Sequence, residues 1–154
     1  MKTLVVYYSY TGNTKNIAAH IAKELNADTA VIDTVTPYEG DYNAVVDQGQ
    51  NEIRNGYKPP IKPINVDLSQ YDTIILGTPV WWYTFAPAVK TFIESNDLSG
   101  KTIVPFATSG GSGMGKTNAG LAPSCRGAKL LDGKVFKMNV TAEELANWVK
   151  SLGI

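Results

Sequence analysis

The sequence predicts an α/β fold in which helices cover both faces of a doubly wound, five-stranded parallel sheet. Short apolar runs rich in Val, Ile and Leu alternate along the chain with stretches whose apolar residues recur three and four positions apart. The first pattern is typical of buried strands and the second of amphipathic helices. Polar, aromatic or glycine-rich loops follow the first, third and fourth strands, at the edge where such sheets bind ligands.

The first half of the chain predicts two strands and two helices. The first strand is expected at residues 4–8, whose sequence is LVVYY, and a helix at 13–25, whose apolar residues share one face. A short second strand is expected at 29–32. A weaker helix is expected at 42–54, and the loop that follows it at 56–63 contains three prolines.

The second half predicts three more strands and two more helices. The third strand is expected at 73–77, the fourth at 102–107 and the fifth at 134–138. Pro87 suits the first turn of a helix that runs from there to Ile93, because that turn needs no backbone N–H. The last helix begins with a capping box, Thr and Glu three residues apart at 141 and 144. Its expected core face consists of Leu145, Trp148, Val149 and Leu152.

The composition is that of a single globular domain spanning residues 1–154. Lys plus Arg and Asp plus Glu each number 14, so the net charge is zero and nothing favours a nucleic-acid or membrane partner. No stretch of 18 apolar residues indicates a transmembrane helix. Cys125 is the only cysteine, which excludes an internal disulfide. We therefore expect a soluble cytoplasmic domain.

The turn after the first strand is rich in hydrogen-bond donors. Its residues are Ser9, Tyr10, Thr11, Gly12, Asn13 and Thr14. The first turn of a helix has unpaired N–H groups and carries the positive end of the helix dipole. Hydroxyls, an amide and a glycine beside such a turn predict an anion cradle suited to phosphate. The alternative is that these side chains are only helix caps, although one or two caps would suffice.

The loop after the third strand is strongly aromatic. It spans residues 78–85 as TPVWWYTF, with four aromatic residues in its last five positions. Aromatic faces stack on flat conjugated rings. We expect Phe85 to pack under the following helix and at least one Trp to serve as a ligand platform. The alternative is that two or three of the aromatic residues pack under that helix.

The loop after the fourth strand, residues 108–117, reads TSGGSGMGKT. Its glycines allow the backbone to approach a ligand and to offer N–H groups to it. Residues 110–117 also match the pattern G-x-x-x-x-G-K-T of nucleoside triphosphate-binding loops. However, Gly120 and Pro123 interrupt the helix that should follow, and the fifth strand does not end in an Asp for magnesium. A P-loop nucleotide-binding module is therefore the distant alternative.

With these three loops, SYTGNT, LGTPVWWY and TSGGSG, the chain resembles the flavodoxin family over its whole length. The resemblance implies a flavodoxin-like sheet of order 2-1-3-4-5 and FMN as the cofactor. It implies that the phosphate is held by Ser9, Thr11, Asn13 and Thr14, with Tyr10 and Gly12 in the same loop. It places against the isoalloxazine ring Thr78, Pro79, Val80, Trp81, Trp82 and Tyr83. The fourth loop contributes Thr108, Ser109, Gly110, Gly111 and Gly113, of which Ser109, Gly110 and Gly111 border the pyrimidine edge of the ring.

Two departures from the well-studied electron-transfer flavodoxins leave two functions open. The fourth loop has no stacking Tyr, which leaves one flavin face open, and neither 78–85 nor 108–117 contains an acid, which eases full reduction. Small size and whole-chain resemblance indicate an electron-transfer protein. The open face and the missing acids indicate an NAD(P)H-dependent flavin or quinone reductase. The partner is accordingly a redox protein or a small-molecule electron donor or acceptor.

No catalytic residue or metal ligand is expected in the chain itself. His20 is the only histidine, and it lies on the first helix away from the expected ligand edge. Cys125 has no paired Cys or His nearby in the sequence, and no cluster has metal-ligand spacing. The flavin would supply the redox chemistry.

Overall fold

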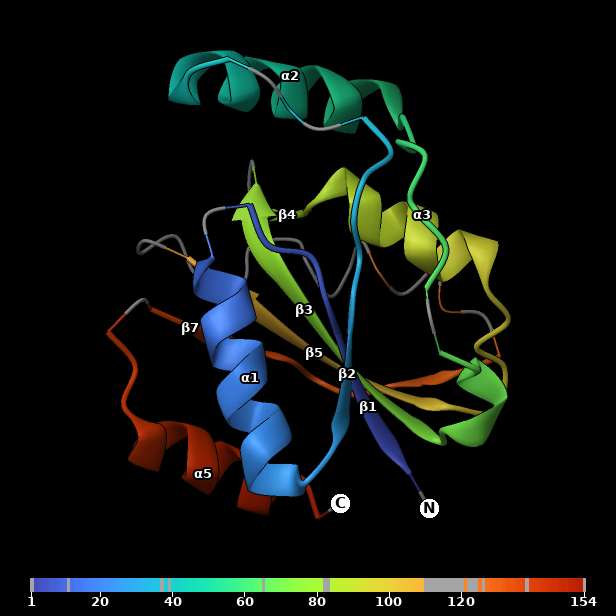
Figure 1. The fold of residues 1–154 in the computed structure, drawn as a ribbon, viewed down its shortest axis with the longest axis vertical. Helices are drawn as coiled ribbons and strands as arrows, with labels where there is room; N and C mark the ends of the chain where they lie inside the picture. Colours follow the sequence, from blue (N-terminus) through green and yellow to red (C-terminus); the bar gives the residue numbers. More distant parts are fainter. Residues whose placement is uncertain are drawn as a thin grey trace.

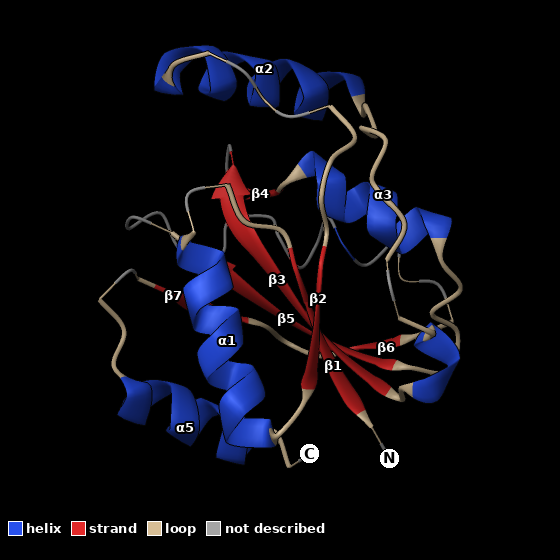
Figure 2. Cartoon of the chain, in the orientation of Figure 1, coloured by secondary structure: helices blue, strands red, loops and turns tan. Residues whose placement is uncertain are grey.

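The seven strands in the described part of the chain belong to one sheet, which is flanked by helices (Figures 1 and 2). The computed structural model describes residues 2–10, 12–36, 38, 40–64, 66–81, 84–109, 121, 125, 127–137 and 139–153. The strands are β1 (Thr3–Tyr7), β2 (Asp28–Val31), β3 (Thr73–Trp81), β4 (Thr84–Phe85), β5 (Thr102–Thr108), β6 (Lys129–Leu130) and β7 (Lys134–Phe136). The helices are α1 (Asn13–Leu25), α2 (Tyr42–Asn55), α3 (Pro87–Ser95) and α5 (Ala142–Ser151), with a short 3-10 helix, η1 (Leu68–Gln70).

The sheet order is β2-β1-β3-β5-β6, and β7 also pairs with β5. β6 pairs with the start of β5 and β7 with its end, so these two short strands share the fifth position of the sheet. Every pairing in this order is parallel. The predicted α/β fold with strand order 2-1-3-4-5 is therefore confirmed, with the fifth strand divided in two.

The largest difference from the predicted elements is the length of β3, which continues to Trp81 instead of ending at Gly77. The extension folds back as a hairpin, because Val80 and Trp81 pair with the antiparallel strand β4. Thr78 stabilises the hairpin at the point where the chain continues into α3. Its Oγ1 accepts a hydrogen bond from the N–H of Ala86 at 2.9 Å. The expected aromatic loop is thus largely strand in the part that the structure describes.

The register of the parallel strands places the ends of β1, β3 and β5 at one edge. Tyr7 is paired with Gly77, and Gly77 with Phe106. The chain leaves each of these strands on the same side of the sheet, because parallel strands share a direction. The loop that precedes α1, the β3–β4 hairpin and Ser109 therefore all lie at the carboxyl edge.

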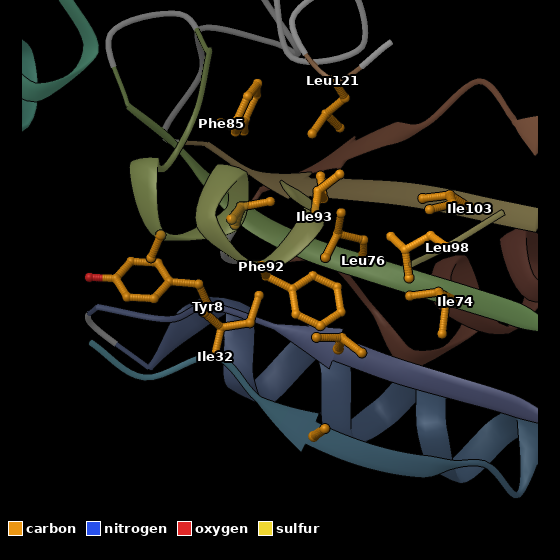
Figure 3. Packing of buried hydrophobic residues seen from close by; sticks show 14 of the residues in the cluster. Tyr8, Ile32, Ile74, Leu76, Phe85, Phe92, Ile93, Leu98, Ile103 and Leu121 are labelled. Atoms are coloured by element: carbon orange, nitrogen blue, oxygen red, sulfur yellow. The ribbon is translucent and has the colours of Figure 1, made fainter. Parts of the chain in front are cut away.

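Each face of the sheet has its own hydrophobic core. On one face α1 and α5 contribute side chains such as Ile21 and Trp148. On the other face α3 contributes Phe92, whose ring is fully buried close to Leu76 of β3 (Figure 3). Phe85 is buried in this second core, so its predicted packing with α3 is confirmed. No helix in the described part of the chain is long and apolar enough to cross a bilayer.

Helix α2 covers neither face but lies beyond the carboxyl end of β3, where it contacts β3 and α3 (Figure 1). Two extended segments lead to it and away from it, and they are joined by an antiparallel bridge between Thr34 and Ile61. Backbone hydrogen bonds of 2.9 and 2.7 Å flank this bridge. We call this ribbon, residues 33–35 and 60–62, the α2 stalk. It holds α2 over the edge where the loops meet.

A substitution at Gly77 tests the packing of β3 against β5. A Cβ at Gly77 would lie 2.3 Å from Cζ of Phe106, far inside van der Waals contact. We expect Gly77→Ala to lower the free energy of unfolding by about 1–3 kcal/mol through overpacking, measured by urea denaturation. Adding Phe106→Leu should recover part of the loss relative to Phe106→Leu alone, because the shorter side chain makes room. A Gly77→Ala variant as stable as the wild type would contradict this packing.

Candidate functional site

The first loop ends in a glycine turn that opens α1. Ser9 Oγ accepts a hydrogen bond of 3.0 Å from the N–H of Gly12. Gly12 has a φ of 95°, and a Cβ there would meet no atom within 4 Å, so backbone conformation rather than space requires glycine. Among the described residues no side chain caps α1, whereas Thr141 caps α5 as predicted and Asp41 caps α2, a cap that was not predicted. The N-terminus of α1 therefore presents its dipole to the loop, as anion binding at a helix requires.

A pair of buried hydroxyls joins the first loop to the fourth. The Oγ1 atoms of Thr14 and Thr108 lie 2.8 Å apart, and the two residues are only 2% and 7% exposed. Two hydroxyls carry two hydrogens, and the bond between them uses one. The pair therefore holds α1 against the end of β5 and keeps one hydrogen that can be donated to a third group.

Thr78 is fully buried, and its hydroxyl is committed to the hairpin. Oγ1 donates to the carbonyl of Pro79 at 2.9 Å while it accepts from the N–H of Ala86. A ligand at this edge would meet the backbone of Thr78 rather than its side chain. Pro79 and Val80 are half-buried on the extension of β3.

Trp81 is the centre of an aromatic cluster at the carboxyl edge. Its ring centroid lies 5.2 Å from that of Tyr38, 5.8 Å from Tyr8 and 6.2 Å from Tyr10, all in edge-on geometry. Such edge-on pairs are favourable because the positive edge of one ring meets the negative face of the other. We call Trp81 with these three tyrosines the Trp81 cluster. It connects the hairpin, the first loop and the segment that leads to α2.

The remaining predicted site residues fall into two groups. Ser109 is buried at the end of β5, and its N–H donates to the carbonyl of Phe136 at 3.1 Å. Asn13 begins α1, and Tyr10 is 40% exposed beside Trp81. The predicted residues that lie outside the described part of the chain are Thr11, Trp82, Tyr83, Gly110, Gly111 and Gly113.

Glu52 of α2 lies at the site although sequence analysis sought acids only in the loops. It is 8% exposed. Its Oε1 accepts a 2.6 Å hydrogen bond from the Tyr38 hydroxyl, and its Oε2 accepts one of 3.0 Å from Gln48 Nε2. The signal that could have revealed it is helical spacing, because Glu52 continues the face of α2 that begins at buried Val45 and passes through Gly49.

Burial and the Glu52 carboxylate act together on the nearby phenols. The pKa of Tyr38 is raised well above its ordinary value of 10, first by burial and then by its hydrogen bond to Glu52. The pKa of Tyr8 is raised as well, first by burial and then by the charge of Glu52. Both phenols therefore stay neutral far into the alkaline range, where an exposed tyrosine ionises.

The other chemically distinctive side chains lie outside this arrangement. His20 is exposed on α1. Cys125 is a buried free thiol whose pKa is raised by burial, which makes it a poor nucleophile at neutral pH. The described residues contain no group of three or more His, Cys, Asp or Glu side chains that could hold a metal ion.

Comparisons with known proteins place this geometry in a family. The family described as flavodoxin matches residues 2–152. A protein of Bacteroides uniformis ATCC 8492 has a similar structure with a TM-score of 0.88 and 31% identity, covering 97% of each chain. A protein of Bacteroides eggerthii DSM 20697 matches with a TM-score of 0.88 and 29% identity, over 99% of this chain and 98% of that one. A Lactobacillus acidophilus NCFM flavoprotein in complex with FMN matches with a TM-score of 0.77 and 27% identity, over 96% and 97%.

Replacing Tyr38 with Phe should make stability less sensitive to alkaline pH. Because folding raises the pKa of Tyr38, the unfolded chain releases this proton above about pH 10 while the native state keeps it. The associated stability is full below that pH and is lost above it, at up to about 1.4 kcal/mol per pH unit. The free energy of unfolding of the Tyr38→Phe variant should therefore fall less steeply with pH above about pH 10 than that of the wild type.

The measurement is urea denaturation from about pH 8 to about pH 11, the range that spans the ordinary tyrosine pKa. Tyr57→Phe is the matched control, because Tyr57 is exposed. This control leaves the hydrogen bond between Tyr38 and Glu52 in place, so the contribution of Tyr38 to the slope should remain. Equal slopes for Tyr38→Phe and the wild type would contradict the raised pKa.

Proposed function

Because this chain belongs to the flavodoxin family, we propose that it binds FMN at the carboxyl edge of the sheet and acts as an electron-transfer flavoprotein. One observation carries the proposal: the N-terminus of α1, which no described side chain caps, and the Trp81 cluster lie at the same edge, bridged by Tyr10. A ligand with a phosphate at one end and a flat conjugated ring at the other matches both features. The FMN held by the Lactobacillus acidophilus flavoprotein supports this choice.

The phosphate of FMN is proposed to bind at the first turn of α1. A helix N-terminus offers N–H groups and a positive dipole to an anion. The Thr14–Thr108 pair has a hydroxyl hydrogen to spare, which a phosphate oxygen would accept. Ser9 and Asn13 are the other described residues proposed to contact the phosphate, together with Thr11. These neutral donors fit a dianionic group without an arginine.

The isoalloxazine ring is proposed to lie against the Trp81 cluster. Pro79, Val80 and Trp81 continue β3 past the sheet and are half-buried there. A flat ring placed on this extension would contact apolar side chains and the ring of Tyr10, and would be shielded from water on that side. The backbone of Thr78 would contribute polar contacts, since its hydroxyl is engaged in the hairpin.

FMN when bound supplies the chemistry by accepting and releasing electrons, while the chain binds, orients and shields it. Electron transfer is preferred to NAD(P)H-dependent reduction because Glu52 lies behind Trp81, so that the site does hold an acid. The open ring face on which the reductase alternative depends involves residues 110–113, outside the described part of the chain. The match over residues 2–152 supports a flavin site rather than a P-loop. The proposed partner is a redox protein or a small-molecule electron donor or acceptor.

The purified protein should be yellow or should become yellow when FMN is added. Flavin released by acid should behave as FMN rather than as FAD or riboflavin on chromatography, because the phosphate end of the site fits one terminal phosphate. The absorbance spectrum and titration of flavin fluorescence measure this directly. A colourless protein that does not bind added FMN would rule out the proposed function.

Replacing Thr14 should weaken the binding of the phosphate end of FMN without affecting the binding of its ring end. Thr14→Ala removes a charge-assisted hydrogen bond, so FMN affinity should fall at least about tenfold while riboflavin affinity stays nearly unchanged. Thr14→Ser keeps the hydroxyl and is the matched control, with FMN affinity close to that of the wild type. Equal losses for FMN and riboflavin in Thr14→Ala would mean that this hydroxyl does not contact the phosphate.

A further inference from the structure

Helix α2 presents a buried face to the Trp81 cluster. Val45, Gly49 and Glu52 follow one another at helical spacing on this face, and Val45 and Glu52 are both buried. Gly49 lies directly against the indole: a Cβ there would be 3.1 Å from Cε3 of Trp81, tighter than an ordinary contact. The missing side chain at this position lets the helix approach Trp81 closely. α2 therefore forms a wall behind the aromatic cluster.

The Glu52 carboxylate is the one charged group on this wall that is buried. Both of its oxygens accept hydrogen bonds, one from the Tyr38 hydroxyl and one from Gln48 Nε2. In the described part of the chain the ion pairs are Lys58–Glu94 and Lys62–Asp33, so no cation neutralises Glu52 there. A buried carboxylate without a cation depends on its hydrogen-bond donors, which gives this network a fixed geometry.

Tyr38 connects the carboxylate to Trp81. Its hydroxyl is held by Glu52 at 2.6 Å, and its ring packs edge-on against the indole with centroids 5.2 Å apart, the shortest ring contact in the Trp81 cluster. Because its hydroxyl is held by Glu52 and its ring by Trp81, the phenol of Tyr38 has one orientation. The indole is thereby confined between the Tyr38 ring, Gly49 of α2 and the ring of Tyr8.

We propose that Glu52 is a positioning residue of the flavin site, which holds the Tyr38 phenol and thereby fixes the Trp81 indole in the orientation that receives the flavin ring. The inference rests on the proposed FMN binding and names a residue on α2, outside the three loops, that determines how well the ring end binds. Gln48 supports Glu52 from one helical turn away. The α2 stalk brings the whole network to the carboxyl edge.

The test uses the full chain freed of flavin and titrated with FMN and with riboflavin, which lacks the phosphate. Glu52→Ala and Tyr38→Phe should weaken both ligands by the same factor, about three- to tenfold, because each change loosens only the ring end. Glu52→Gln should restore near-wild-type affinity, since its amide can still accept from Tyr38 and can donate to Gln48. Asp47→Asn, an exposed acid on the same helix, should change nothing.

A second readout needs no flavin. Near-ultraviolet circular dichroism reports the fixed packing of the Trp81 cluster and should weaken in Glu52→Ala and Tyr38→Phe but not in Glu52→Gln. Tyr38→Phe removes a single oxygen, so it keeps the test decisive even where Glu52→Ala does not fold. Unchanged riboflavin affinity in a folded Tyr38→Phe variant, or a loss confined to FMN, would overturn the inference. A wild-type chain that binds neither ligand would instead overturn the proposed function.

Discussion

The site depends on the register of three parallel strands. Tyr7, Gly77 and Phe106 form one row across β1, β3 and β5, and each segment at the carboxyl edge begins within a few residues of that row. The same register sends Val5 to the core beside α1 and its neighbours in β1 to the core beside α3. A slip of one residue would exchange the two cores and separate the loops. Packing on both faces therefore holds the site together, and Tyr8 belongs both to the core beside α3 and to the Trp81 cluster.

The sequence was sufficient to predict the elements in which apolar residues recur with a regular period. Strands and helices of several residues show their period, which is why the α/β fold was predicted correctly. The capped start of α5 followed from Thr141 and Glu144 three residues apart, and the strand order followed from the resemblance to the flavodoxin family. β4 and β6 have two residues each, too few for any period to appear. The continuation of β3 to Trp81 depends on its pairing with β4 and on the Thr78 hydroxyl, which only the folded hairpin brings into place.

For the candidate site, sequence reasoning found what lies directly after strands and missed what reaches the edge from elsewhere. Glu52 is preceded by Val45 and Gly49 at helical spacing, so a buried face could be predicted, but not the surface that this face would meet. That depends on the α2 stalk, a pairing of Thr34 with Ile61 that is non-local in the sequence. The same pairing brings Tyr38 to Trp81. Local sequence patterns do not show that α2 lies beyond the carboxyl edge instead of on a face of the sheet.

The α2 stalk also separates the packing that stabilises the fold from the helix that lines the ligand edge. Because α2 is carried on a ribbon beyond the sheet, no described residue of α2 is among the buried members of the two cores that hold the strands together. Substitutions in α2 therefore act directly on one wall of the ligand edge and reach the core beside α3 through Tyr38 and Trp81, which pack against it. Proteins built this way can diversify what they bind, or how tightly, by changing one peripheral helix. In this design the sheet is the platform of the site, and α2 is the peripheral element through which the site can be altered.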